Sequence, residues 1–322
     1  MKANVCTKYG SPEVLEFIEL EKPVPQQDEL LVKIHAASVN AADLETLRGD
    51  FIVRMASPRK PMHAILGSDI AGVVEEVGTD VKEFQPGDEV WADLSFPHAL
   101  GGFAEFVCAS EKAFNLKPAS MTFKEAAAYP QAAMVALQSL RDKGNIKPGD
   151  KVLINGAGGG MGTFAVQLAK YFGAEVTAVD KQIKLDMLRS LGADRVLDYQ
   201  QEDYTKNGQE YDLVLDVAAY RSIFDYQRAL SPEGIFMMVG GSLTTLLQVV
   251  ILGTILSKTG SKKIGINAWK PNKTEDLAFL AELFEAGKVV PVIDRYYSLP
   301  EVPEALRYLQ SGSVKGKLVI KM

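Results

Sequence analysis

The spacing of hydrophobic and polar positions changes near residue 123 of this 322-residue chain. Before it, short apolar or alternating runs separated by Pro and Gly predict strands at 30–35, 72–77, 89–92 and 103–109. After it, apolar positions spaced four residues apart alternate with short continuous apolar runs, which predicts helices and strands in turn. This order predicts an irregular β domain and an α/β domain with a doubly wound parallel sheet.

The second part of the chain has the clearer pattern. Its expected helices lie at 125–143, 163–172, 185–191 and 222–230, and its expected strands at 151–154, 176–179, 213–217, 235–239 and 262–269. We assign the amphipathic helix at 275–285 and the strand at 317–321 to the first domain. The expected domains are therefore 1–125 with 270–322, and 126–269.

A glycine-rich turn joins the strand that ends at Asn155 to the helix that begins near Thr163. Residues with little or no side chain permit a tight turn, a close approach of the backbone to a pyrophosphate, and close packing of helix on strand. The first N–H groups of a helix lack intrahelical partners and favour an anion. The candidate dinucleotide-binding residues here are Ala157, Gly158, Gly159, Gly160, Met161 and Gly162, with Ala157 at the usual first glycine.

Asp180 ends the next expected strand, about 20 residues after Gly159, where an acidic residue commonly accepts a hydrogen bond from a ribose hydroxyl. Strand, turn, helix, strand and acid thus follow in the order of a dinucleotide-binding unit. The alternative interpretation is a glycine-rich loop in an ordinary parallel sheet.

Charge and cysteine content narrow the possible partners and compartments. The net charge is −6 without a basic run, which disfavours nucleic acid as the main partner. No signal peptide precedes the first strand pattern, so we expect a cytoplasmic protein. Cys6 and Cys108 are too few for a disulfide framework and too distant in sequence for a local metal site, and we expect both to be buried.

The apolar segment 243–256 is the one stretch that suggests further contacts. It is too short to span a bilayer and is interrupted by Thr and Gln. We expect it to be covered by a second subunit or to lie over a substrate site, with a peripheral membrane contact as the alternative.

The chain resembles the medium-chain dehydrogenase/reductases, and among them the zinc-free quinone oxidoreductases. The residues that carry this resemblance are Tyr9–Leu15 (YGSPEVL), Asn40–Asp43 (NAAD), Gly67–Gly72 (GSDIAG), Pro86–Val90 (PGDEV), Gly101–Glu105 (GGFAE), Asn155–Gly162 (NGAGGGMG), Ser190–Asp194 (SLGAD) and Gly316–Ile320 (GKLVI). The resemblance implies a GroES-like catalytic domain, a Rossmann domain, a cofactor cleft between them and a homodimer.

The same resemblance implies that zinc is absent. The position similar to the family's first zinc-binding cysteine is Asn40, the family's Gly-His-Glu is Gly67-Ser68-Asp69, and no thiol lies near Gln131. The closely spaced cysteines of the structural zinc lobe are also missing. A site improvised from His63, Asp69 and His98 is an alternative that their spacing does not favour.

Without a metal, the expected reaction is direct hydride transfer from a reduced nicotinamide to a quinone or an α,β-unsaturated carbonyl. Asn40 and Asp43 are the candidate catalytic residues because the resemblance places their loop at the cofactor cleft. Asn and Asp after a strand also form ordinary turns, so a structural role stays open. Relatives often carry a tyrosine at the position of Glu45 and, close to the nicotinamide, a threonine at the position of Val135, so a tyrosine proton donor and one positioning hydrogen bond are missing.

Some residues near the expected ribose site favour NAD as the cofactor, and others favour NADPH. Asp180 favours NAD because its charge would repel a 2′-phosphate. Lys184 and Tyr199 match positions that hold this phosphate in NADPH-using relatives, and Lys181 adds positive charge. We expect NADPH. Gly240, Gly241 and Lys317 complete the expected cofactor-binding set on the strength of the resemblance.

Two further hypotheses remain open. An enoyl-thioester reductase of the same architecture would perform the same 1,4-addition of hydride. A nucleotide-binding interaction protein would retain the fold without turnover, because fold alone does not imply function.

Overall fold

The computed structural model describes residues 1–95 and 100–322, which form two compact units. Unit 1 contains Met1–Ala132, Pro271–Glu285 and Ile293–Met322, and unit 2 contains Ala133–Lys270 and Ala286–Val292. Two segments that follow residue 270 in the sequence thus belong to unit 1. The functional domain boundaries expected from the sequence, at 125/126 and 269/270, stay a prediction.

Unit 1 is built around a mainly antiparallel sheet of seven strands in the order β14-β15-β3-β4-β5-β7, with β6 also paired to β3. The strands are β3 (Glu29–Val39), β4 (Asp69–Val77), β5 (Glu89–Asp93), β6 (Phe106–Ser110), β7 (Phe114–Leu116), β14 (Ile293–Ser298) and β15 (Lys317–Lys321). β1 (Lys2–Val5) and β2 (Glu16–Glu19) form a separate pair. Only β14 and β15 run parallel to each other, and β15 lies between β14 and β3.

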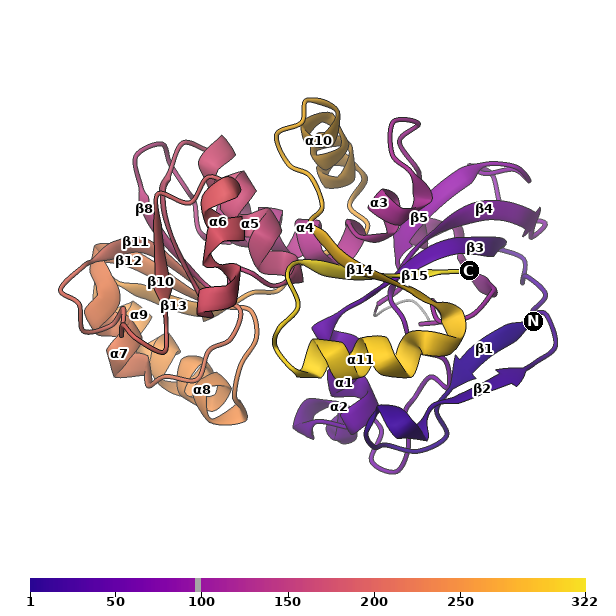
Figure 1. The fold of residues 1–322 in the computed structure, drawn as a ribbon, viewed down its shortest axis with the longest axis horizontal. Coiled ribbons are helices and arrows are strands. Elements are labelled where there is room, and N and C mark those ends of the chain that lie inside the picture. The colour runs from indigo at the N-terminus through magenta and orange to yellow at the C-terminus, as the bar shows by residue number, and fades with distance from the viewer. Residues whose placement is uncertain (96–99) are drawn as a thin grey trace. The chain divides into compact units, whose positions relative to one another are not determined.

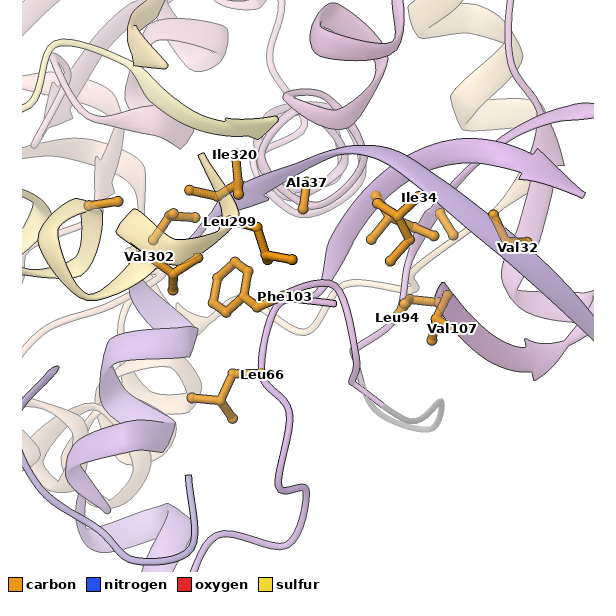
Figure 2. Close-up of a cluster of buried hydrophobic side chains, with 14 of the residues drawn as sticks. Val32, Ile34, Ala37, Leu66, Leu94, Phe103, Val107, Leu299, Val302 and Ile320 are labelled. Atoms are coloured by element: carbon orange, nitrogen blue, oxygen red, sulfur yellow. The ribbon is translucent and has the colours of Figure 1, made fainter. Parts of the chain in front are cut away.

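The helices of unit 1 are α1 (Ala41–Arg48), α2 (Phe51–Ala56), α3 (Phe123–Ala127), α10 (Thr274–Glu285) and α11 (Val302–Gln310). Side chains of β3 and β15 point toward Phe103 and toward residues at the start of α11 (Figure 2). Ile34, Ala37 and Ile320 lie on the sheet side of this core, and Leu299 and Val302 face them (Figure 2). This apolar core holds together segments that lie far apart in the sequence.

Unit 2 contains a six-stranded parallel sheet in the order β10-β9-β8-β11-β12-β13. Its strands are β8 (Lys151–Asn155), β9 (Glu175–Asp180), β10 (Arg195–Asp198), β11 (Tyr211–Asp216), β12 (Leu230–Met238) and β13 (Lys263–Ile266). Numbered from β8, this order is 3-2-1-4-5-6, the order of a dinucleotide-binding Rossmann sheet. The strand order therefore places the topological switch point between β8 and β11.

Helices of unit 2 flank this sheet (Figure 1). They are α5 (Gly160–Tyr171), α6 (Leu185–Ser190), α7 (Ile223–Ala229), and α8 (Leu243–Gln248) continued by a π-helical turn (Val249–Gly253) and α9 (Thr254–Thr259). The expected fold class, a GroES-like β domain with a doubly wound parallel sheet, is confirmed. No helix among the described residues is long and apolar enough to cross a membrane.

The expected single helix at 125–143 is wrong. The structure divides it into α3, α4 (Pro130–Gln138) and a π-helical turn (Ser139–Lys143). Pro130 begins α4 because proline lacks an N–H and disfavours helical geometry in the residue before it. The expectation for the cysteines is confirmed for Cys6, which is buried, but Cys108 is only half-buried.

Candidate active site

Five polar side chains of unit 1 form a buried hydrogen-bonded cluster, which we call the Asn40 cluster: Asn40, Ser68, Asp69, Gln131 and Lys317. Sheet register explains how residues so far apart in sequence meet. Ser38 of β3 pairs with Asp69 of β4, and Val39 of β3 pairs with Leu318 of β15. The ends of three neighbouring strands thus bring Asn40, Asp69 and Lys317 together.

Two opposite charges contact the amide of Asn40. The Lys317 ammonium donates to Asn40 Oδ1 at 2.5 Å, and Asn40 Nδ2 donates to Asp69 Oδ2 at 2.9 Å and to Ser68 Oγ at 3.0 Å. Lys317 Nζ also lies 3.3 Å from Asp69 Oδ2, with both side chains almost completely buried. A buried ammonium is stable here because a carboxylate and an amide oxygen surround it.

Asp43 has a structural role at the start of α1. Its Oδ2 accepts from the backbone N–H of Asn40 at 2.8 Å, and its Oδ1 accepts from the N–H of Gly67 at 3.1 Å. Burial, with the nearby charge of Asp69, raises the pKa of Asp43 to about 7. The side chain therefore caps the helix and ties it to the loop before β4. The catalytic role expected for Asn40 and Asp43 stays a prediction, and these contacts supply the structural role that the sequence had left open.

Lys317 was expected to bind the cofactor, but the structure places its side chain in the Asn40 cluster. The side chain is 2% exposed and contacts Asn40 and Asp69. A direct contact with the cofactor stays a prediction for this residue. Sequence reasoning treated Ser68 and Gln131 only as substitutes for metal ligands, and it had no signal for their hydrogen bonds to each other.

The cysteine thiols lie away from the Asn40 cluster. Cys6 Sγ contacts the backbone oxygen of His63 at 3.8 Å, and burial raises the pKa of the Cys6 thiol to about 11. Within residues 1–95 and 100–322, no group of three or more His, Cys, Asp and Glu side chains is placed to hold a metal ion. His98, part of the alternative metal site, lies outside the described residues.

Unit 2 carries the glycine-rich turn between β8 and α5. Gly159 is the N-cap of α5 in an extended conformation, and no side chain caps this end of the helix. A Cβ built on Gly159 would meet only the Gly156 oxygen, at 3.5 Å, so the space beside the turn is open. The free first-turn N–H groups and the open space fit a pyrophosphate. Gly160 and Met161 are partly exposed there, whereas Ala157, Gly158 and Gly162 are buried.

Asp180 binds the turn from the end of β9. Its Oδ2 accepts from the N–H of Gly158 at 2.8 Å, and its Oδ1 accepts from the N–H of Lys181 at 2.8 Å. Lys184 Nζ lies 3.2 Å from Asp180 Oδ1, and both side chains are buried. Asp180 therefore fixes the glycine-rich turn, while Lys184 offsets its charge.

The remaining expected cofactor residues lie near the carboxyl ends of the same strands. Tyr199 follows β10, and its backbone N–H donates to the backbone oxygen of Asp180 at 3.4 Å. Gly240 and Gly241 follow β12 and lie against Ala219 beyond the end of β11. In open α/β sheets, ligands bind outside the carboxyl ends of the strands. Cofactor contact by Tyr199, Gly240 and Gly241 stays a prediction.

Sequence reasoning missed a second buried group at the switch point. Asn155 at the end of β8 donates to Asp216 Oδ1 at 2.8 Å, and Tyr204 donates to Asp216 Oδ2 at 3.2 Å. Burial raises the pKa of Asp216, which is completely inaccessible to solvent. The sequence did contain a signal for this group, because Asp216 is the last residue of a central strand, β11. Its hydrogen bonds connect β8 to β11 at the point where the strand order reverses.

A separate cavity of about 300 Å³ in unit 1 shares no residue with the Asn40 cluster. It lies beneath α10 and is lined in part by Trp91, Phe114 and Leu277. The polar side chains of the Asn40 cluster therefore do not line this cavity.

Comparison with known proteins gives matches along the whole chain. Residues 26–119 match the family model described as alcohol dehydrogenase GroES-like domain, and residues 191–320 match the one described as zinc-binding dehydrogenase. The human mitochondrial NAD(P)H oxidoreductase RTN4IP1 is 33% identical, with 100% of this chain and 89% of the relative covered. The 2-methylene-furan-3-one reductase of Solanum lycopersicum is 35% identical, with 99% of this chain and 79% of the relative covered.

Solved structures agree with these relatives. The quinone oxidoreductase of Coxiella burnetii has a TM-score of 0.90 and 31% identity, covering 100% of this chain and 99% of the other. The Escherichia coli quinone oxidoreductase complexed with NADPH has a TM-score of 0.87 and 25% identity, covering 100% of both chains.

A GroES-like β domain together with a Rossmann sheet defines a class of two-domain oxidoreductases. This chain belongs to the medium-chain dehydrogenase/reductase superfamily, and within it to the quinone oxidoreductases. One matched family description names zinc, so the question of a metal has to be judged from the side chains of this chain.

Proposed function

We propose that this chain is a zinc-independent reductase that transfers hydride to quinones or α,β-unsaturated carbonyls. The observation that carries the proposal is the composition of the Asn40 cluster. Asn40, Ser68 and Gln131 stand at or near positions that resemble zinc ligands, yet they offer neutral amide and hydroxyl groups. Asp69, the carboxylate of the cluster, already accepts from Asn40 and pairs with Lys317. Zinc prefers thiolate, imidazole and carboxylate ligands. The Lys317 ammonium on Asn40 Oδ1 would in addition repel a divalent cation.

We propose NADPH as the preferred cofactor. When bound, the reduced nicotinamide supplies the hydride. The free N–H groups at the start of α5 would hold the pyrophosphate, with Gly159 permitting close approach. Lys184 supports a 2′-phosphate because its ammonium offsets the charge of Asp180. The NADPH in the Escherichia coli relative supports the same preference.

The first experiment is turnover measured by loss of nicotinamide absorbance. NADPH and NADH are each tested against a panel of small quinones and enones, once with added zinc and once with a chelator. We expect chelator-insensitive turnover that is faster with NADPH. Turnover that requires zinc would overturn the proposal that the reductase is zinc-independent. Saturable cofactor binding without turnover would favour the alternative hypothesis of a nucleotide-binding interaction protein.

We also propose that the chain forms a homodimer through unit 2. β13 is an edge strand of the sheet, and the helical segment beside it exposes Leu247, Ile251 and Ile255 to 50%, 59% and 54%. An exposed edge next to an apolar stripe is typical of a surface that pairs with another chain. The relatives compared above include a mitochondrial protein, so the cytoplasmic location proposed here for this chain has to be tested by cell fractionation.

A further inference from the structure

The Ser68 hydroxyl in the Asn40 cluster accepts hydrogen bonds from two side-chain amides. Asn40 Nδ2 lies 3.0 Å from Ser68 Oγ, and Gln131 Nε2 lies 3.3 Å from it. A hydroxyl oxygen has two acceptor lone pairs. Both are therefore filled, and the oxygen has no capacity for a further donor.

Charged neighbours fix the direction of both amides. Lys317 on Asn40 Oδ1 and Asp69 on Asn40 Nδ2 admit only one orientation of the Asn40 amide, because the reverse would set the ammonium against an NH₂ group. Gln131 Nε2 also lies 3.5 Å from Asp93 Oδ1. These contacts direct amide N–H groups, and not amide oxygens, toward Ser68.

The hydroxyl hydrogen of Ser68 consequently has to point away from both amides. Within residues 1–95 and 100–322, no side chain or backbone group accepts it. Accepting two hydrogen bonds polarises an O–H group and makes it a stronger donor. Asn40 and Gln131 each remain 8% exposed and Ser68 2%, whereas Asp69 and Asp93 are completely buried. The solvent-accessible surface at this place thus belongs mainly to Asn40 and Gln131, the two residues that donate to Ser68, and the two carboxylates have none.

We propose that the Ser68 hydroxyl donates a hydrogen bond to the carbonyl oxygen of the substrate. The proposal rests on the reductase function proposed above. When hydride adds to an enone, the C–H bond of the donor breaks and a C–H bond forms at the β-carbon. The C=C π pair moves to the bond between the α-carbon and the carbonyl carbon, and the C=O π pair moves onto oxygen, which gives an enolate. The substrate gains two electrons and the nicotinamide loses them. Ser68 stabilises the oxyanion without losing its proton, and water supplies the proton of the product.

Ser68→Ala and Ser38→Ala form a matched pair for the test. Ser38 is also buried and donates its hydroxyl to Asp69 Oδ2 at 3.1 Å, so its removal perturbs the same cluster without removing an outward-directed donor. Two quantities are measured in each variant. One is kcat with an enone and a quinone, and the other is the affinity for 4-nitrophenolate, an oxyanion that binds without reacting.

We expect Ser68→Ala to lower kcat by about 100-fold, the usual effect of removing one oxyanion donor. It should weaken 4-nitrophenolate binding by about 10-fold or more and leave the affinity for NADPH unchanged. Ser38→Ala should change each quantity by less than about 3-fold. Unchanged kcat and 4-nitrophenolate affinity in Ser68→Ala would overturn the proposal, and so would equal losses in Ser38→Ala.

The two proposals fail in different ways. If the wild type reduces neither enones nor quinones but Ser68→Ala still weakens 4-nitrophenolate binding, the proposed function fails and the donor role stands. If the wild type binds no 4-nitrophenolate, the donor role fails whatever the turnover. Should Ser68→Ala not fold, Ser68→Thr has to retain the affinity because it keeps the hydroxyl, and a 10-fold loss in that variant counts against the proposal.

Discussion

Gly162 and Gly159 in the glycine-rich turn between β8 and α5 differ in what an added methyl group would meet. A Cβ at Gly162 would lie 2.3 Å from the Gly156 oxygen and 2.6 Å from both the Cα and the carbonyl carbon of Ala157. All three are backbone atoms that cannot rotate away. A Cβ at Gly159 would meet nothing closer than 3.5 Å. The two alanine variants therefore separate the packing role of a glycine from its role at a ligand.

We expect Gly162→Ala to lower the free energy of unfolding of unit 2 by at least about 3 kcal/mol, the upper part of the usual range for overpacking, because three backbone atoms have to move. Gly159→Ala should cost less than about 1 kcal/mol, since its backbone is extended and alanine is only a poorer N-cap than glycine. Its methyl group would instead occupy the open space where a pyrophosphate approaches. We expect NADPH to bind at least about 10-fold more weakly, or about 1.4 kcal/mol.

Urea unfolding measures the first effect, and titration of NADPH fluorescence measures the second. The two variants serve as controls for each other because both add one methyl group to the same turn. Wild-type affinity for NADPH in Gly159→Ala would refute the assignment of this turn to the pyrophosphate. Wild-type stability in Gly162→Ala would refute the packing argument.

Three further predictions concern charge and association. The pKa of Asp43 is raised from 3.8 to about 7 in the folded state, which therefore binds an extra proton between these values. Stability should fall by roughly 4 kcal/mol as pH rises from well below 4 to well above 7, and urea unfolding should show a smaller change in Asp43→Asn. Lys184→Met leaves the Asp180 carboxylate buried without its cation and should destabilise the protein by about 3 kcal/mol. It should also reduce the ratio of kcat/KM with NADPH to kcat/KM with NADH, and an unchanged ratio argues against a role of Lys184 in binding the 2′-phosphate. Ile251→Glu should convert a dimer to monomers in light scattering, whereas a wild-type monomer contradicts the proposed interface.

Local sequence patterns predicted unit 2 well because its elements are regular and its connections are short. β9 and α5 agree with the expected positions to within about three residues, and the alternation of helices and strands predicted the parallel sheet, though not its strand order. The glycine turn and Asp180 were identifiable for the same reason. The contacts of Asp180 with Gly158 and Lys184 were not, because spacing does not show whether a carboxylate is already occupied.

The Asn40 cluster could not be predicted from local pattern. Lys317 lies 277 positions after Asn40 in sequence, and only the pairing of β15 with β3 brings them together. The resemblance had identified Asn40, Ser68 and Gln131 as positions without the family's zinc ligands, but it had no information on which side chains these residues contact. The sequence analysis also did not predict α1, although Asn40 and Asp43 form the capping box of this helix.

The position of β15 in unit 1 has a consequence for synthesis on the ribosome. β15 inserts between β14 and β3, yet both β14 and β15 follow almost all of unit 2 in the sequence. Unit 2 can therefore complete its sheet while β3 still lacks one neighbour. Until the last strands emerge, that edge of β3 has unpaired backbone groups and Asn40 lacks the ammonium that orients it. The sheet that contains the early strand β3 thus cannot be completed before unit 2 has been synthesised.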